Sequence, residues 1–296
     1  MKGMITSTQR LSIHDGPGIR TVIFMKGCHM RCKWCHNPET WSRERQLQYL
    51  SDKCIGCGLC VTSCPEKALA KCGDKVKPDY ALCTVCGLCA ENCCSQALSV
   101  VGREVSPEAL LEEILIDKPY FDRSKGGITL SGGEPLLQKE FAMAFLALCR
   151  QRGLNTAVES NLCMDWEVVS HFLPYVDCWM CDLKLMDTGK HKYWTGVDNR
   201  SILANIENFG KAGIALTVRT PVVPGVNDSF EEIERICRFL EPYRGTVRYH
   251  LLPFHTLGFG KYDALGMENE MIHTQGFPKE RLEELNKMVS TYKLAL

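Results

Sequence analysis

Three cysteines near the start of the chain have the spacing of an iron–sulfur cluster site. Cys28, Cys32 and Cys35 form the pattern C-x3-C-x2-C directly after a predicted strand. Three close thiolates hold three irons of a 4Fe–4S cube and leave the fourth iron open to an external ligand. An open position on a metal is reactive, as it is in catalytic zinc sites. On spacing alone, a structural zinc ion with a remote fourth ligand, such as His36, explains the same three cysteines.

A second region is denser in cysteine, with ten between residues 50 and 101. It contains two copies of the run C-x2-C-x2-C-x3-C, and Pro65 follows the first copy. Bacterial ferredoxins have this run, and the fourth cysteine of each copy serves the other cluster. The repeat therefore favours two further 4Fe–4S clusters over a pair of zinc knuckles. The expected ligand sets are Cys54, Cys57, Cys60 and Cys93 for one cluster, and Cys83, Cys86, Cys89 and Cys64 for the other.

The composition limits the classes of partner. Lys plus Arg and Asp plus Glu both total 35 among 296 residues, so no net field attracts nucleic acid. The first ten residues lack the apolar core of a signal peptide, and no apolar run approaches the length of a bilayer span. Clustered thiols in such a chain indicate ligands rather than disulfides. We expect a cytoplasmic protein that binds neither nucleic acid nor a membrane.

Strand-like and helix-like segments alternate around these cysteines. Helices are expected from Ser106 onward and at 137–152, 166–172, 201–212, 229–240 and 279–292. Strands are expected at 19–26, 127–131, 155–159, 177–183, 214–223 and 246–252. Six βα units imply a parallel sheet, and eight would close a barrel. The predicted fold class is therefore α/β: an incomplete, TIM-like (β/α)6 barrel of residues 1–49 and 102–296, with an inserted ferredoxin-like, two-cluster domain at 50–101.

A second motif gives the first cysteine cluster a specific meaning. Ser131-Gly132-Gly133-Glu134-Pro135 follows the second predicted strand, as the cysteines follow the first. Together and in this order, the two motifs resemble the radical S-adenosylmethionine superfamily. The resemblance implies that the methionyl group of the cofactor chelates the open iron. It also implies that an electron from the cluster cleaves the cofactor to a 5′-deoxyadenosyl radical. The glycines would let the backbone approach the methionyl group closely.

Further segments resemble one branch of that superfamily, the activating enzymes of glycyl-radical enzymes, relatives of pyruvate formate-lyase activating enzyme. These segments are HDGPGIR at 14–20, WCHNPE at 34–39, MCDLK at 180–184, Arg219 with VVPG at 222–225, and LLPFH at 251–255. The resemblance implies hydrogen abstraction from a glycine of a partner enzyme, with electrons from a low-potential donor such as flavodoxin or ferredoxin. The insert is similar to that of the activases of glycerol dehydratase, choline lyase and hydroxyphenylacetate decarboxylase.

The resemblance also assigns residues to a cofactor pocket. Trp34 would lie against the adenine, Gly133 would contact the methionyl amino group, and Lys184 would pair with the methionyl carboxylate. The other implied pocket residues are Cys35, His36, Gly132, Glu134, Asp182, Leu183, Arg219 and His255. A monovalent cation beside the carboxylate would be held by Asp182, Glu159, Ser160 and the Met180 carbonyl. Glu159 departs from the aspartate of the simplest family pattern and lengthens the reach of that ligand.

Asp15 is expected to meet the peptide of the partner enzyme, because an open barrel leaves one flank accessible. Plainer interpretations exist: Lys184 as a solvated lysine, Trp34 as a core aromatic, Arg219 as half of an ion pair. Two other functions fit the cysteines, a radical enzyme that modifies a small molecule or peptide, and an electron carrier without turnover. A carrier has no need of Gly133 or Lys184, and the segment 14–20 favours the activating enzyme.

Overall fold

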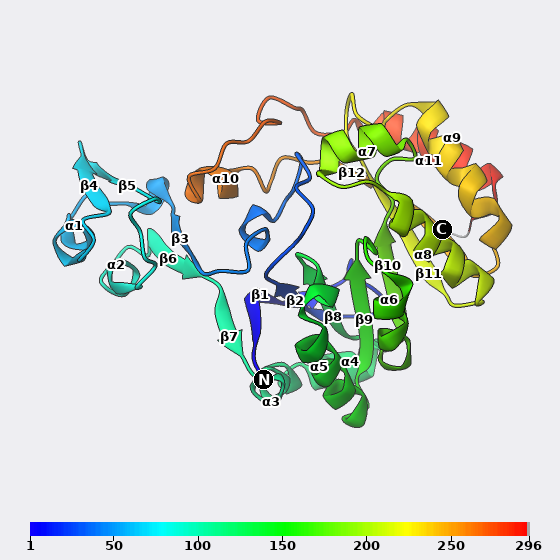
Figure 1. Ribbon diagram of the computed structural model, residues 1–296, viewed down its shortest axis with the longest axis horizontal. Helices are drawn as coiled ribbons and strands as arrows, with labels where there is room; N and C mark the ends of the chain where they lie inside the picture. Colours follow the sequence, from blue (N-terminus) through cyan, green and yellow to red (C-terminus); the bar gives the residue numbers. More distant parts are fainter. Residues whose placement is uncertain (295–296) are drawn as a thin grey trace.

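An eight-stranded, mostly parallel sheet forms the centre of the molecule (Figure 1). The computed structural model describes residues 1–294. The strand order is β12-β11-β10-β9-β8-β2-β1-β7, and the neighbours from β2 to β12 run parallel. The parallel strands are β2 (Arg20–Met25), β8 (Gly127–Gly132), β9 (Asn155–Ser160), β10 (Cys178–Asp182), β11 (Leu216–Val222) and β12 (Val247–Pro253). All six predicted strands are confirmed to within two residues at each end.

Helices between these strands pack on the outside of the sheet (Figure 1). They are α3 (Pro107–Leu115), α4 (Lys118–Ser124), α5 (Lys139–Gln151), α6 (Trp166–Phe172), α7 (Thr188–Thr195), α8 (Arg200–Lys211), α9 (Phe230–Leu240) and α11 (Lys279–Thr291). In α9, Ile233, Ile236, Cys237 and Leu240 form the buried stripe expected of an amphipathic helix. Short 3-10 turns complete the chain: η1 (Pro38–Thr40), η2 (Ser51–Lys53), η3 (Pro135–Gln138), η4 (Leu173–Tyr175) and η5 (Glu241–Tyr243).

One predicted helix starts later than expected. The segment expected to be helical from residue 137 begins with the tighter turn η3, and α5 starts only at Lys139. The Glu134 side chain accepts a hydrogen bond from the Leu136 amide, which stabilises the tighter turn. By contrast, α3 begins as predicted, with Ser106 accepting from the Ala109 amide and Pro107 in the first turn.

The sheet is open rather than closed into a barrel. It ends at β12 on one edge and at β7 (Arg103–Val105) on the other. Both β1 (Gly3–Ser12) and β7 are antiparallel additions that the sequence did not predict. β1 is polar and only partly buried, so it lacks the apolar run that identified the parallel strands. An α/β fold with a mostly parallel sheet, forming a partial barrel, is therefore confirmed.

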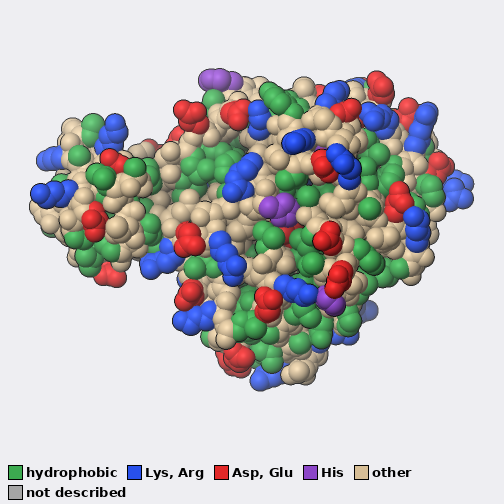
Figure 2. All heavy atoms as spheres, viewed as in Figure 1, with side chains coloured by type: hydrophobic (Ala, Val, Ile, Leu, Met, Phe, Trp, Pro, Cys, Tyr) green, Lys and Arg blue, Asp and Glu red, His purple; other side chains and the backbone are tan. Residues whose placement is uncertain are grey.

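The segment between β2 and α3 projects from the sheet as a separate lobe (Figures 1 and 2). Its chain leaves along β3 (Gln46–Tyr49) and returns along β6 (Leu98–Val101), paired antiparallel. The lobe also contains the hairpin β4 (Leu69–Cys72) and β5 (Lys75–Pro78), and the short helices α1 (Leu59–Ser63) and α2 (Leu88–Glu91). Eight buried side chains give it a core of its own: Leu47, Tyr49, Cys60, Leu69, Val76, Cys89, Ala97 and Leu98.

The two cysteine runs of the lobe have the same local backbone. Gly58 precedes α1 with a φ of 78°, and Gly87 precedes α2 with a φ of 93°. Both values lie in the left-handed region, which glycine adopts without the steric cost of a Cβ. Each glycine directly follows the second cysteine of its run, so the sequence repeat is also a structural repeat.

The surface carries no region of a single charge on the face that Figure 2 shows. Lys and Arg side chains are interspersed with Asp and Glu side chains over both the lobe and the sheet domain. This agrees with the formal net charge of zero. Within the described residues, no helix combines the length and the apolar character that crossing a membrane requires.

Candidate functional site

A cavity of about 270 Å³ lies at the carboxyl ends of the parallel strands. Cys28, Cys32 and Cys35 form one side of it, on the loop that follows β2. Residues at or after the other five parallel strands complete the wall. The predicted site residues that line the cavity are Trp34, His36, Gly132, Gly133, Glu159, Ser160, Asp182, Lys184 and His255. The structure thus brings together residues that are spread over most of the chain.

Four predicted residues lie behind this wall rather than on it. Glu134 and Leu183 are fully buried, Met180 is nearly so, and Arg219 approaches from β11. Glu134 accepts hydrogen bonds from the Ser160 hydroxyl at 2.9 Å and from the Asn161 amide at 2.8 Å. Burial raises the pKa of Glu134 to about 7. Its contacts hold the loop after β9 in place, which is a positioning role.

The loop with the three cysteines is fixed by contacts from distant parts of the chain. The Tyr262 hydroxyl donates to the Cys35 carbonyl at 3.0 Å, and the Asn161 side-chain amide lies 3.9 Å from the Cys28 sulfur. The His36 ring stacks on the His255 ring at 4.1 Å, and its Nε2 lies 2.8 Å from the His255 carbonyl oxygen. That nitrogen is therefore engaged, and not placed to complete a zinc site with the cysteines.

The two glycines of the second motif bring β8 against the cysteine loop. Gly132 has a φ of 97°, which favours glycine. A Cβ added to Gly133 would overlap the Gly27 carbonyl, one residue before Cys28. The Gly133 amide also donates to the Met25 carbonyl at 2.9 Å. The absence of side chains at these two glycines lets β8 pack directly against the backbone of β2 and of the cysteine loop, and both glycines line the cavity.

Two partly buried carboxylates and two buried cations balance each other at the cavity. Lys184 Nζ lies 2.8 Å from Asp182 Oδ2, while Arg219 pairs with Glu159 and places its Nε 3.5 Å from Asp182 Oδ1. Burial opposes the ionisation of Asp182, but Lys184 and Arg219 outweigh it and lower its pKa. Burial likewise disfavours the charged lysine, but Asp182 outweighs it and raises the pKa of Lys184. Lys184 is thus a buried charge rather than a solvated lysine.

The cavity retains polar atoms that a ligand could use. Asp182 Oδ1 and Arg219 Nε are buried without a hydrogen-bond partner of good geometry. These two atoms lie 3.5 Å from each other within the ion pair, so the charged group that lines the cavity and can meet a ligand is the Lys184 ammonium. With the three thiols and the Gly133 backbone, it fits a 4Fe–4S cluster together with the zwitterionic methionyl end of S-adenosylmethionine.

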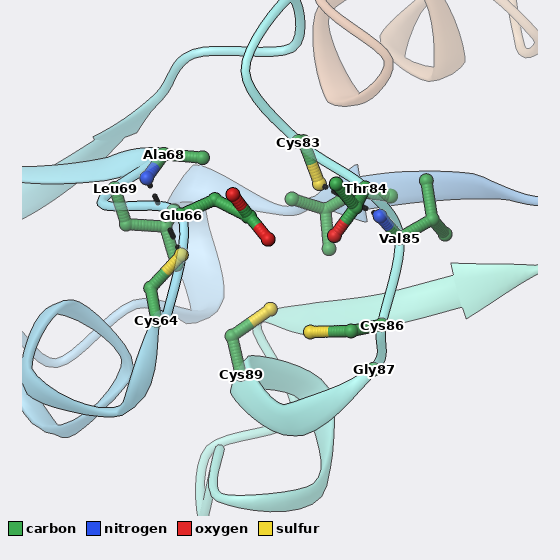
Figure 3. Close-up of a pocket in the computed structure, with 11 residues that line it drawn as sticks. Cys64, Glu66, Ala68, Leu69, Cys83, Thr84, Val85, Cys86, Gly87 and Cys89 are labelled. Atoms are coloured by element: carbon green, nitrogen blue, oxygen red, sulfur yellow. Dashed lines mark hydrogen bonds between the residues drawn. The ribbon is translucent and has the colours of Figure 1, made fainter.

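Four cysteines surround each of two hollows in the lobe. Figure 3 shows one of them, where the sulfurs of Cys64, Cys83, Cys86 and Cys89 point toward a common space. The other is lined by Cys54, Cys57, Cys60 and Cys93. These are the two cross-paired sets that the sequence predicts. Over residues 1–294, no three His, Cys, Asp or Glu side chains converge on one metal-ion position, whereas the thiolates of a cube bind separate irons.

Asp15 lies away from the cavity, near the amino end of β2, whereas the cysteines follow its carboxyl end. Its carboxylate accepts a hydrogen bond from the Ser12 hydroxyl, and its carbonyl accepts from Thr129 Oγ1 at 2.7 Å. Its charge nevertheless acts on Glu159 and Arg219 and contributes to raising the pKa of both. Asp15 therefore lies electrostatically close to the ion-paired residues without lining the pocket.

The sequence matches the family model described as the radical SAM superfamily over residues 83–240. The chain belongs to the radical SAM superfamily. The match starts at residue 83, so the family model does not cover Cys28, Cys32 and Cys35. These cysteines are linked to the matched region by the cavity, which residues of both line. A second model, described as a 4Fe-4S binding domain, matches residues 47–70 in the lobe of this radical SAM protein.

Similar proteins place this radical SAM chain among the activating enzymes. The choline trimethylamine-lyase activating enzyme of Oleidesulfovibrio alaskensis is 37% identical, over 98% of this chain and 96% of that protein. The (2S)-3-sulfopropanediol dehydratase activating enzyme of Klebsiella oxytoca is 40% identical, over 94% and 91%. Among solved structures, Streptococcus suis SuiB bound to precursor peptide SuiA matches 92% of this chain and 45% of its own, with 12% identity and a TM-score of 0.55. That likeness shows the fold alone.

Sequence reasoning missed three residues that support the radical SAM cavity: Asn161, Lys261 and Tyr262. Asn161 adjoins the predicted Glu159 and Ser160, so its place after a strand was a usable signal. Tyr262 lies 227 residues from its partner Cys35, and no local pattern connects the two. Lys261 bonds to Asn37 and Glu39 over a similar separation.

Proposed function

We propose that this protein activates a glycyl-radical enzyme. It would cleave S-adenosylmethionine reductively and use the resulting 5′-deoxyadenosyl radical to take a hydrogen atom from one glycine Cα of the partner. The observation that carries the proposal is the convergence of Cys28, Cys32 and Cys35 with Gly133 and Lys184 on one cavity. Relatives over nearly the whole length of the chain are named activating enzymes, and the enzymes they are named for differ. The identity of the partner therefore stays open.

Each residue of the cavity has a proposed task. Cys28, Cys32 and Cys35 would hold the cluster, whose open iron supplies the electron and the binding position for the methionyl group. Gly133, whose backbone lines the cavity, would contact the methionyl amino group. Lys184, already charged and buried, would pair with the methionyl carboxylate. Trp34 and His36 would line the adenine end.

We also propose that the lobe holds accessory iron–sulfur clusters. The two cysteine hollows would hold one 4Fe–4S cluster each, which gives the protein three in all. We propose residues 50–101 as the ferredoxin-like domain and residues 1–49 with 102–296 as the catalytic core. The lobe would pass electrons from a low-potential donor, such as flavodoxin or ferredoxin, to the catalytic cluster.

The monovalent cation fits this site less well than the cluster does. Glu159 is paired with Arg219, and Ser160 donates its hydroxyl to Glu134. Asp182 is paired with Lys184. Three of the four implied ligands are thus engaged, and a cation here requires Arg219 to leave Glu159. Cofactor affinity in potassium, sodium and choline salts tests the site. Dependence on potassium or sodium supports the cation, and equal affinity in all three salts eliminates it.

Paramagnetic resonance of a candidate partner tests the proposed function. Each candidate partner, such as any glycyl-radical enzyme found encoded beside this chain, is incubated anaerobically with the reconstituted protein, dithionite and S-adenosylmethionine. The expected result is a glycyl doublet together with 5′-deoxyadenosine. Product without a doublet in any such partner would favour modification of a small molecule or peptide. Absence of both would favour an electron carrier.

A further inference from the structure

A short helix connects the lobe to the cysteine loop. Helix α10 (Gly260–Ala264) follows β12 and lies between the sheet and the lobe (Figure 1). Lys261 Nζ donates to Asn37 Oδ1 at 2.7 Å and to Glu39 Oε1 at 2.6 Å. Tyr262, almost fully buried, donates to the Cys35 carbonyl at 3.0 Å. One side of α10 thus fixes the turn that carries Cys35, Asn37 and Glu39.

The other side of this segment receives a side chain from the lobe. The Tyr80 hydroxyl donates to the Ala264 carbonyl at 3.0 Å. The Tyr80 ring lies against Gly266, where an added Cβ would overlap the ring. Gly266 has a φ of 66°, so the backbone here favours a residue without a side chain. The lobe therefore rests on the same short segment that supports the cysteine loop.

Tyr80 belongs to the part of the lobe that is nearest to the core. It packs against the hydrophobic core of the lobe and lies three residues before Cys83. Cys83 also lines a groove shared with Met4 and Gly102, which lie outside the lobe core. The hollow around Cys54 is lined only by residues of the lobe, including Tyr49 and Leu98 of its connecting strands β3 and β6. The Cys83 hollow is thus the inner of the two.

We propose that Tyr80 is a positioning residue that fixes the Cys83 hollow relative to the Cys28–Cys35 loop, with α10 as the joint between them. The proposal rests on the proposed function, because it assumes clusters at both places. Electron tunnelling falls steeply with distance, so a displaced lobe slows transfer between the clusters. It does not prevent a small reductant from reaching the catalytic cluster. Electrons would therefore pass from the Cys54 hollow to the Cys83 hollow and then to the Cys28–Cys35 loop.

The test compares two reductants in variants of the whole reconstituted protein. Tyr80→Ala removes the contact from the lobe, and Gly266→Ala disturbs it from the core side. Tyr80→Phe keeps the ring on Gly266 and loses one hydrogen bond. Tyr120→Ala on α4 is the matched control, since Tyr120 is an exposed tyrosine outside the lobe. The rate of 5′-deoxyadenosine formation is measured with reduced flavodoxin and with dithionite. The magnetic coupling between reduced clusters is measured in the same samples.

Tyr80→Ala and Gly266→Ala are expected to retain their iron and the dithionite-driven rate. They are expected to lose most of the flavodoxin-driven rate and to show weaker coupling between the clusters. Tyr80→Phe is expected to stay close to the unchanged protein. If Tyr80→Ala and Gly266→Ala lowered the flavodoxin-driven and the dithionite-driven rates equally, or changed neither rate, the positioning role would be overturned. Absence of cleavage by the unchanged protein with dithionite would overturn the proposed function itself, which is a separate outcome.

Discussion

The cavity at the strand ends and the hollows of the lobe differ in how much of the surrounding hydrophobic core their cysteines make up. At the cavity, the loop with Cys28, Cys32 and Cys35 is supported by Tyr262 and Asn161, and by strands that pack in a large core. Cys32 is one member of that large core, whereas Cys60 and Cys89 are two of only eight buried side chains in the small core of the lobe. The core fold thus positions its cluster ligands, whereas in the lobe the cluster ligands make up a larger share of the hydrophobic core itself.

Size explains the difference. A chain segment as short as the lobe buries too little apolar surface to be stable alone, and metals commonly stabilise such domains. Where a site forms only in the folded state, the free energy of metal binding becomes free energy of folding. We therefore expect loss of the clusters to unfold the lobe and to leave the sheet folded.

The largest expected loss of cofactor cleavage follows from replacing Cys28, Cys32 and Cys35 by alanine. All formation of 5′-deoxyadenosine should stop, and about one third of roughly twelve irons should be lost. The circular dichroism of the core should persist, because the sheet and not the cluster holds these residues. Iron analysis and product chromatography measure the two effects. Residual 5′-deoxyadenosine from the triple variant would show that the catalytic cluster lies elsewhere.

The next largest effect is expected from Lys184→Met. Removing one partner of a fully buried ion pair costs about 3–5 kcal/mol of unfolding free energy. The loss here should be smaller, because Asp182 is partly exposed and keeps Arg219. It should also weaken S-adenosylmethionine binding strongly, because the methionyl carboxylate loses its partner. Denaturant titration and equilibrium binding measure the two quantities. Lys118→Met is the control, since its exposed pair with Asp122 contributes about 1 kcal/mol or less. Equal effects of both variants would contradict the assignment.

A smaller effect on cleavage is expected from the double change Cys60→Ala and Cys89→Ala. Each removes one ligand from a lobe cluster and one side chain from the lobe core. The lobe should become sensitive to protease, while the core keeps cofactor binding and dithionite-driven cleavage. Limited proteolysis with mass spectrometry locates the cuts. Cys72→Ala is the matched control, because Cys72 is exposed and lines neither hollow. A protease-resistant lobe in the double variant would contradict the dependence of its fold on clusters.

No loss of cleavage is expected from Asp15→Ala. Asp15 lies outside the cavity, so cofactor binding and 5′-deoxyadenosine formation should persist. Activation of the partner should fall, because hydrogen transfer requires a closely oriented glycine Cα. Paramagnetic resonance of the partner measures the loss, with Ser12→Ala as a control that keeps the Asp15 carboxylate but removes the hydroxyl that bonds to it and to the His14 amide. A full-strength glycyl signal with Asp15→Ala would refute this role.

The sequence predicted the parallel strands and the cavity because both have local signals. Apolar runs mark buried parallel strands, and motifs at their carboxyl ends must meet at one edge of the sheet. The convergence of Gly133, Asp182 and Lys184 on the three cysteines follows from that rule alone. The ligand sets of the lobe followed from the ferredoxin repeat in the same way.

Features that depend on distant partners were not predictable. Arg20 and Lys26 are fully buried, although their type indicates the surface. Arg20 donates to Thr129 and Asn155, and Lys26 donates to Gln46 and the Glu39 carbonyl, all outside their own strand. For Arg219, the sequence left two interpretations open, a residue of the cofactor pocket and one half of an ion pair. The pairing with Glu159 could not be predicted, because the sequence does not reveal which carboxylate will lie next to a given cation.

The pairing of β3 with β6 has a consequence for how such proteins diversify. Gln46 lies opposite Val101, so the chain leaves the core and returns to it at neighbouring points. A segment attached in this way can be gained, exchanged or deleted without pulling β2 and α3 apart. Replacing residues 46–101 by a short glycine-rich turn should therefore leave a compact protein with the catalytic cavity intact. A folded deletion variant that still binds S-adenosylmethionine would show that the lobe is a detachable module.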